Sequence, residues 1–222
     1  WALISSGTFG CRYFEEGMIF DISSHSLFCN QQHLLYYLAF LCSKLGNYFI
    51  KILNPTLNTS AGVVSTLPIV ENSELFDQVT KISSQLIQIS KIDWNFFEIS
   101  WDFNILPMLA LDLKGASVSE SYSNWNSVCA DNIIKMKELE EENNRFFIKS
   151  YGLQNELSPD VPEGQITLAC ADKEADIKRL ISYSVGCMMG RYSLDIRGLV
   201  YAHAGNDRFD HNKYKTFPAD GD

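Results

Sequence analysis

The sequence is poor in positive charge. Its 222 residues include 18 Lys and Arg against 27 Asp and Glu, so the formal net charge at pH 7 is −9. This balance excludes a generally basic surface of the kind that coats nucleic acid. It does not exclude a module that reads a base sequence inside a larger enzyme, because the electrostatic attraction can then come from other parts of that enzyme.

Long apolar runs are also missing. The most apolar stretch, residues 34–42, is too short to span a bilayer, and Lys44, Asn47 and Lys51 interrupt its continuation. We therefore expect a soluble, cytoplasmic domain with no membrane partner. The chain begins with Trp1 instead of Met and stops within a polar run, so we expect it to be a piece of a longer protein.

Close cysteine pairs are absent as well. The six cysteines are scattered along the chain, which favours reduced thiols over a disulfide framework. His25, Cys29 and His33 are evenly spaced and Cys11 could come near them, but structural zinc sites usually include a close cysteine pair. We therefore expect no metal to be bound here.

The strongest helical pattern lies between Gln31 and Leu53, where leucines and other apolar residues recur at helical spacing. Pro55 is expected to end this helix, because proline lacks an N–H and biases Asn54 away from the α region. A small polar turn follows, and residues 66–70 are predicted to be a short extended segment. The turn concentrates amides and hydroxyls that can bind a polar partner without carrying charge.

The remaining pattern predicts an α+β fold. A β-hairpin is expected over residues 8–22, and helices over residues 73–92, 124–151 and 172–190, with Gly152 closing the second of these. Residues 110–121 are small and polar, as in a linker. We therefore predict a small mixed α/β subdomain over residues 1–110 and a mainly helical subdomain over residues 111–222, with a long amphipathic helix and a polar tail.

Aromatic residues crowd the segment before Pro107. Such density is more often a core plug between two subdomains than a platform on which bases stack, so we favour a buried cluster. The residues concerned are Trp94, Phe96, Phe97, Trp101 and Phe103.

Asp160, Asp176 and Lys178 match the residue types of a nuclease site, in which two acidic residues and a lysine hold Mg²⁺ for phosphodiester hydrolysis. In such a nuclease site the second acidic residue and the lysine lie on a strand. The periodicity around Asp176 is helical, so we favour a surface charge pair on a helix.

Several stretches together carry a family resemblance. They are a helix running into NPTLN and then LPIV at residues 54–70, RYFEEGMIFDISSHSLF at residues 12–28, ISYSVGCMMGRYSLDIRGLVYA at residues 181–202 and KTFPAD at residues 215–220. In this order they resemble the region downstream of the catalytic domain in PglX-type adenine-specific DNA methyltransferases of bacteriophage-exclusion (BREX) systems. The resemblance implies that residues 1–110 are a target-recognition-like subdomain. It also implies three kinds of partner: double-stranded DNA, the upstream methyltransferase domain and other phage-defence proteins.

The catalytic features of such an enzyme are not found in this sequence. Adenine methylation needs a pocket for S-adenosylmethionine and an Asn/Asp-Pro-Pro-aromatic turn that holds the flipped base. Asn54 and Pro55 match only the first two positions of that turn, and the glycines at positions 7 and 10 precede a predicted hairpin instead of a helix. The resemblance assigns both features to the region upstream of Trp1. We therefore expect no catalytic residue and no bound cofactor here, and an inactive fragment when the chain is isolated, with S-adenosylmethionine bound by the full-length enzyme.

DNA contacts are expected from loop residues that present short polar or bidentate groups. Asn can pair with adenine, Arg with guanine, and hydroxyls with base edges or phosphates. In the NPTLN turn the same side chains can instead satisfy backbone groups at a helix end, and the basic stretch near the C-terminus can be an ordinary solvated tail. The candidates are Arg12, Ser23, Ser24, His25, Asn54, Thr56, Asn58, Thr59, Arg191, Lys213 and Lys215.

A second function class stays open. The chain could be a helical protein-interaction scaffold that docks other defence components and does not touch DNA. The negative net charge and the acidic run over residues 138–142 favour this alternative, whereas the polar loops favour DNA.

Overall fold

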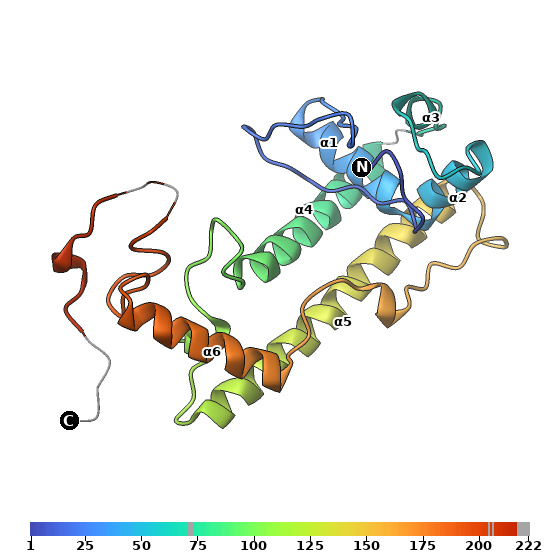
Figure 1. Cartoon of the computed structure of the whole chain (residues 1–222). Helices are drawn as coiled ribbons and strands as arrows, with labels where there is room; N and C mark the ends of the chain where they lie inside the picture. The colour runs from blue at the N-terminus through green and yellow to red at the C-terminus, as the bar shows by residue number, and fades with distance from the viewer. Residues whose placement is uncertain (71–72, 204, 206, 217–222) are drawn as a thin grey trace. The chain divides into compact units, whose positions relative to one another are not determined.

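The computed structural model describes residues 1–70, 73–203, 205 and 207–216, and these are mainly helical (Figure 1). Two compact units can be distinguished. Unit 1 consists of Trp1–Ile89 with Ile134–Ile166, and unit 2 of Ser90–Ile133 with Thr167–Asp222. The helices are α1 (Gln31–Cys42), α2 (Lys44–Leu53), α3 (Ala61–Ser65), α4 (Ser73–Asn95), α5 (Val118–Ser150) and α6 (Lys173–Met188), with short 3-10 helices η1 (Pro107–Leu109), η2 (Glu163–Gln165) and η3 (His211–Lys213).

The units are interleaved in sequence. α4 and α5 each contribute residues to both units, and the predicted subdomain boundary at residue 110 falls inside unit 2. Across the described residues, no helix combines the length and the apolar character needed to cross a membrane.

The predicted α+β class is wrong. The only β pairings in the described part of the chain are two isolated bridges, and neither residues 8–22 nor residues 66–70 form a strand. The expected hairpin keeps a turn at Glu16 and Gly17 but has no ladder of cross-strand hydrogen bonds. A lone hairpin needs a packed face to be stable, and here Ile19 is 99% and Ile22 84% exposed. The β propensity of this segment therefore has no buried surface to stabilise a sheet.

The single helix predicted between Gln31 and Leu53 is two helices separated by Ser43. The Ser43 hydroxyl donates to the carbonyl of Phe40 (2.6 Å) and accepts from the N–H of Gly46 (3.0 Å), so it ends α1 and caps α2. A Cβ at Gly46 would lie 2.3 Å from the Phe40 carbonyl oxygen, so this corner requires glycine. The predicted stop before Pro55 is confirmed, since α2 ends at Leu53.

The three downstream helices are confirmed with shifted ends. α5 begins at Val118, inside the segment that was expected to be a linker. Ser117 accepts from the N–H of Glu120 (3.2 Å), and the Glu120 carboxylate accepts from the N–H of Ala116 (2.7 Å), as in a capping box. The predicted stop at Gly152 is confirmed. This residue has a φ of +70°, a conformation that glycine adopts without strain.

The core of unit 1 is formed by aromatic and aliphatic side chains of α1, α2, α4 and α5. Tyr36 stacks on Phe76 with ring centroids 5.1 Å apart, and Phe147 meets Phe40 edge-on at 5.3 Å. Two asparagines of α5 satisfy backbone groups at the corner between α1 and α2. Asn143 donates to the carbonyl of Ala39 (2.9 Å), and Asn144 accepts from the N–H of Lys44 (2.8 Å).

Unit 2 has two smaller clusters. One surrounds Tyr183 and Tyr192, whose rings stack at 4.6 Å, and the other surrounds Trp125 and Cys129. Burial raises the pKa of both Tyr183 and Cys129 to about 12, so both groups are neutral at physiological pH.

Candidate nucleic-acid interface

Residues 1–5 bring two of the predicted DNA-contacting loops together in unit 1. Leu3 donates its N–H to the carbonyl of Ser23 (3.0 Å), and its own carbonyl accepts from the N–H of Thr59 (2.8 Å). The first segment therefore runs between residues 23–25 and residues 57–59 and pairs with both. The two isolated antiparallel bridges are part of this arrangement, joining Ala2 to Ser24 and Ile4 to Asn58.

Trp1 fixes the spacing of these loops. Its indole N–H donates to the carbonyl of Thr59 (2.9 Å), and its ring lies against the His25 imidazole with centroids 5.7 Å apart. The Thr59 side chain is buried. His25 and Thr59 thus hold the loops in place, whereas Ser23 and Asn58 have exposed side chains. Nothing in the local pattern around Trp1 indicated this long-range pairing.

The Asn54 and Thr56 side chains bond within the NPTLN turn. The Asn54 amide donates to the carbonyl of Asn58 (2.6 Å), and the Thr56 hydroxyl donates to the Asn54 side-chain oxygen (2.7 Å). The N–H of Asn58 in turn donates to the Thr56 hydroxyl (3.3 Å). Such bonds are those expected of residues that end a helix and close a turn. Asn58 contributes its backbone to this network and exposes its side chain.

Two other candidates of unit 1 differ in their surroundings. Arg12 is exposed on the irregular segment before the turn at Glu16 and Gly17. The carbonyl of the neighbouring Cys11 accepts from the Cys42 thiol (3.5 Å). The Ser23 hydroxyl donates to the Asp21 carboxylate (2.5 Å), and this bond is the first cause of the lowered pKa of Asp21. A carboxylate beside Ser23 disfavours a phosphate there, so a base edge is the better partner for this loop.

The basic residues near the C-terminus belong to a paired segment in unit 2. The Ser193 hydroxyl donates to the carbonyl of Lys213 (2.7 Å). The Asp195 carboxylate accepts from the N–H groups of Lys215 (2.6 Å) and Thr216 (2.8 Å). The bonds from Thr216 and Lys215 hold the pKa of Asp195 below its ordinary value. Residues 193–195 and 213–216 are therefore hydrogen-bonded to each other, and residues 217–220 of the predicted KTFPAD match lie outside the described part.

Arg191 has a charged partner. Its guanidinium lies 2.9 Å from the Glu98 carboxylate and 5.8 Å from the centroid of the Tyr192 ring. This pairing reduces the charge that Arg191 can offer to a phosphate. Lys213 is half-buried and Lys215 is exposed.

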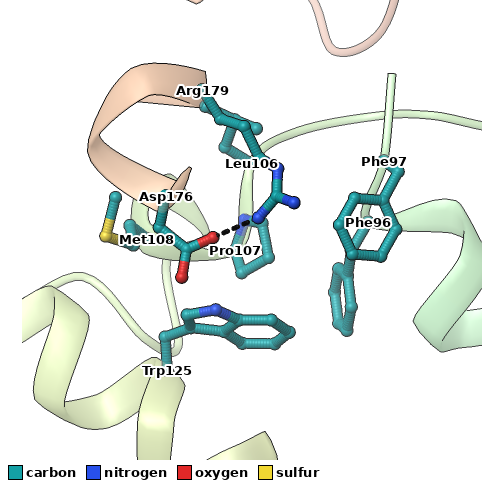
Figure 2. Close-up of a pocket in the computed structure, with 8 residues that line it drawn as sticks. All are labelled: Phe96, Phe97, Leu106, Pro107, Met108, Trp125, Asp176 and Arg179. Atoms are coloured by element: carbon teal, nitrogen blue, oxygen red, sulfur yellow. Dashed lines mark hydrogen bonds and ion pairs between the residues drawn. The ribbon is translucent and has the colours of Figure 1, made fainter. Parts of the chain in front are cut away.

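Unit 2 also contains a hollow that the sequence analysis did not identify. Asp176 and Arg179 lie one turn apart on α6 and form an ion pair of 2.5 Å above the Trp125 indole (Figure 2). The Arg179 guanidinium also lies 4.9 Å from the centroid of the Phe97 ring. The lining residues are Phe96, Phe97, Leu106, Pro107, Met108, Trp125, Asp176 and Arg179, and an adjoining depression adds Glu98, Ile99, Phe103, Ser182 and Tyr183. Asp176 is thus on a helix, as its periodicity predicted, but the predicted surface charge pair is wrong. Asp176 is buried and pairs with Arg179, whereas Lys178 pairs with Glu174 (2.5 Å).

The aromatic segment around this hollow only partly matches the predicted core plug. Phe103 is buried, and Phe96 packs edge-on against Trp125 at 5.0 Å. In contrast, Trp101 is 90% and Trp94 54% exposed. Within the described residues, no group of three or more His, Cys, Asp or Glu side chains is positioned to hold a metal ion.

The class of protein that this chain resembles is that of the adenine-specific methyltransferases. It is 40% identical over 221 residues to the adenine-specific methyltransferase PglX of Lacticaseibacillus casei (strain Zhang), covering 98% of the chain and 18% of that protein. It is 34% identical over 244 residues to the adenine-specific methyltransferase BrxX of Escherichia coli O9:H4 (strain HS), covering 100% of the chain and 20% of that protein. These matches confirm the predicted resemblance to PglX-type methyltransferases.

The chain spans about a fifth of the length of the curated relatives it matches, so the similarity concerns one segment of them. No family model matches the chain.

Proposed function

We propose that this chain is the DNA target-recognition region of an adenine-specific (N6) DNA methyltransferase in a phage-exclusion or restriction-modification system. The observation that carries the proposal is the similarity of almost the whole chain to one segment of two adenine-specific methyltransferases. In this function the chain supplies no catalytic group. S-adenosylmethionine and the base-flipping pocket belong to the upstream methyltransferase domain, and the enzyme acts on double-stranded DNA in the cytoplasm.

The mechanism proposed for unit 1 is positioning. Residues 1–5 link the loop at residues 23–25 to the NPTLN turn, so the two loops keep a fixed separation. A fixed separation is what a module needs to read base edges at a set spacing along the groove. Ser23, Asn58 and Arg12, whose side chains are exposed, are the candidates for base contact, whereas Asn54, Thr56 and Thr59 maintain the loop conformations.

The experiment that tests the proposal is a segment exchange. The segment of the Lacticaseibacillus casei PglX that matches this chain is replaced by this chain, and the methylated adenines of the host genome are mapped by sequencing. We expect methylation to continue at a new sequence motif. A chimera rebuilt with its own segment through the same junctions is the control, and it should keep the original motif. If an active chimera still methylates the original motif, the chain is not the target-recognition region.

The alternative function, a docking scaffold without DNA contact, is less well supported by the structure. The two features that favoured it were the negative net charge and the acidic run over residues 138–142, which was predicted to be a solvated face. Glu141 instead accepts from the N–H of Val161 (3.1 Å), Leu139 is buried, and burial raises the pKa of Glu140. Glu140 and Glu141 are thus half-buried in unit 1, whereas Glu138 and Glu142 are exposed as predicted. Interaction with other phage-defence proteins remains compatible with the proposed function.

A further inference from the structure

We propose that the aromatic hollow of unit 2 binds a single unpaired DNA base. This aromatic hollow is the depression that adjoins the one drawn in Figure 2. Its lining residues are Phe96, Phe97, Glu98, Ile99, Phe103, Leu106, Arg179, Ser182 and Tyr183. This inference rests on the proposed function and adds to it a second contact with DNA, separate from the loops of unit 1. It also gives a role to the aromatic segment that does not fit a buried plug.

The size and walls of the hollow suit a flat ring. Its volume is ≈ 290 Å³, close to the lower end of small-molecule sites, and a single base is smaller than the ligands of most such sites. Four aromatic rings contribute to the lining, from Phe96, Phe97, Phe103 and Tyr183. Phe103 and Tyr183 are buried, so the half-buried rings of Phe96 and Phe97 are the ones that a base can reach. Stacking on aromatic rings is available to every base, because each base has a π-face.

The polar groups of the hollow suit the edge of a base. Arg179 is a donor and Glu98 an acceptor, while the Ser182 hydroxyl can act as either. Every DNA base carries both donors and acceptors on its edge, so it can use groups of both kinds. A hydrocarbon side chain from a partner protein would displace water from the carboxylate and the guanidinium without replacing its hydrogen bonds, which is costly. The chemistry therefore favours a base over a hydrocarbon anchor from a partner protein.

These polar groups are held in position before any ligand arrives. The Asp176 carboxylate is buried and accepts both from Arg179 (2.5 Å) and from the N–H of Asp172 (3.0 Å). Glu98 is held by the Arg191 guanidinium at 2.9 Å. Arg179 nevertheless keeps 43% of its side chain exposed, so its remaining donors can reach a ligand. Groups fixed in this way lose little conformational entropy when a ligand binds.

Two exposed tryptophans lie on the same segment of the chain. Trp101 and Trp94 lie within ten residues of Phe97 in the chain and present large apolar rings to solvent. Aromatic rings that alternate with a few polar groups are typical of surfaces that bind single-stranded nucleic acid. Their exposure agrees with a site for unpaired bases and disagrees with a core plug.

The test compares two DNA duplexes of the same sequence, one fully paired and one with a single unpaired adenine as a bulge. Binding of this chain to each is measured by fluorescence anisotropy at low salt. We expect the bulged duplex to bind about 5- to 150-fold more tightly, which is the range for stacking one base. Phe97→Ala should remove most of this difference, and Glu98→Gln, which preserves the shape of the hollow, should reduce it.

The matched control is Phe14→Ala, which removes an exposed aromatic ring in unit 1 and should leave the difference unchanged. Melting curves of each variant show whether it is folded. Equal affinity for the two duplexes, or a difference that persists in folded Phe97→Ala, would overturn the inference while leaving the proposed function intact. Failure to bind either duplex would count against both.

Discussion

Asn54 and Asn58 lie at opposite ends of one turn, but only Asn54 uses its side chain to close it. The Asn54 amide bonds to the Asn58 carbonyl at 2.6 Å, so Asn54→Ala removes that bond and the acceptor for the Thr56 hydroxyl. We expect Asn54→Ala to lower the free energy of unfolding by about 1 kcal/mol, the usual net contribution of a hydrogen bond. Asn58→Ala should change it by less than about 0.5 kcal/mol, as for most exposed positions. Urea denaturation of both variants measures the two values.

DNA binding by the same two variants distinguishes the two interpretations that the sequence left open. The asparagine side chains either contact DNA bases or close the NPTLN turn. If the turn reads DNA, Asn58→Ala weakens binding while the protein stays as stable as the wild type. Asn54→Ala is then the control for indirect effects of turn disruption. Destabilisation by Asn58→Ala, or unchanged DNA binding, would assign this asparagine to the turn alone.

At the scale of elements, the attachment of residues 213–216 to residues 193–195 should depend on pH. Hydrogen bonds from Thr216 and Lys215 lower the pKa of Asp195 from its ordinary value of 3.8. A carboxyl group with a lowered folded-state pKa contributes stability above its ordinary pKa, and this contribution is lost as the pH falls through the folded-state value. The amide protons of Lys215 and Thr216 should therefore be protected from exchange above pH 3.8 and lose protection below it, as measured by NMR.

Asp210 provides the matched control for this element. Its pKa is also lowered, by the N–H of Asn212, but it does not bond to Lys215 or Thr216. In Asp195→Asn the two amides should have weak protection that no longer follows pH, whereas Asp210→Asn should keep the wild-type profile. The same profile in Asp195→Asn as in the wild type would show that other contacts hold the segment.

Helices were predictable where one stretch of sequence contains both the apolar periodicity and the residue that ends the helix. The helices before Pro55 and Gly152 end as predicted. The start of α5 could also have been predicted, because Ser117 and Glu120 have the spacing of a capping box. The break at Ser43 was not predictable from periodicity, because apolar spacing continues across it. Its local signal is Ser43, which caps α2, and Asn144 of α5 also accepts from the N–H of Lys44 at this corner.

At the scale of the whole molecule, the predicted fold class is wrong because strand propensity does not tell what the strands would pack against. Residues 8–22 were predicted to be a hairpin, yet of these residues only Phe9 and Cys11 pack against the helical core of unit 1. The pairing of residues 1–5 with two distant loops consists of long-range backbone hydrogen bonds and the contact of Trp1 with Thr59, which no local pattern encodes. The candidates for DNA contact were therefore chosen by the chemistry of their side chains. Their division between the loops of unit 1 and the C-terminal segment of unit 2 required the structure.

The net charge of −9 indicates that few cations of this chain neutralise phosphates, so DNA binding should depend only weakly on salt concentration. Each phosphate neutralised by Lys or Arg contributes about −0.9 to the slope of log K against log salt concentration. Of the cationic candidates, Arg191 is paired with Glu98, which leaves Arg12, Lys213 and Lys215. The slope for duplex DNA should thus be no steeper than about −3, measured by titration at a series of salt concentrations.

Lys215→Ala and Arg191→Ala test which cations contribute to the salt dependence of DNA binding. Lys215→Ala should reduce the slope by about 1, because an exposed cation is lost. Arg191→Ala should change it little, because the charge removed is already balanced by Glu98. A much steeper slope would mean that cations outside the candidate set bind the phosphates. Failure to bind duplex DNA at the lowest salt would favour the scaffold alternative, since weak electrostatic attraction is least screened under that condition.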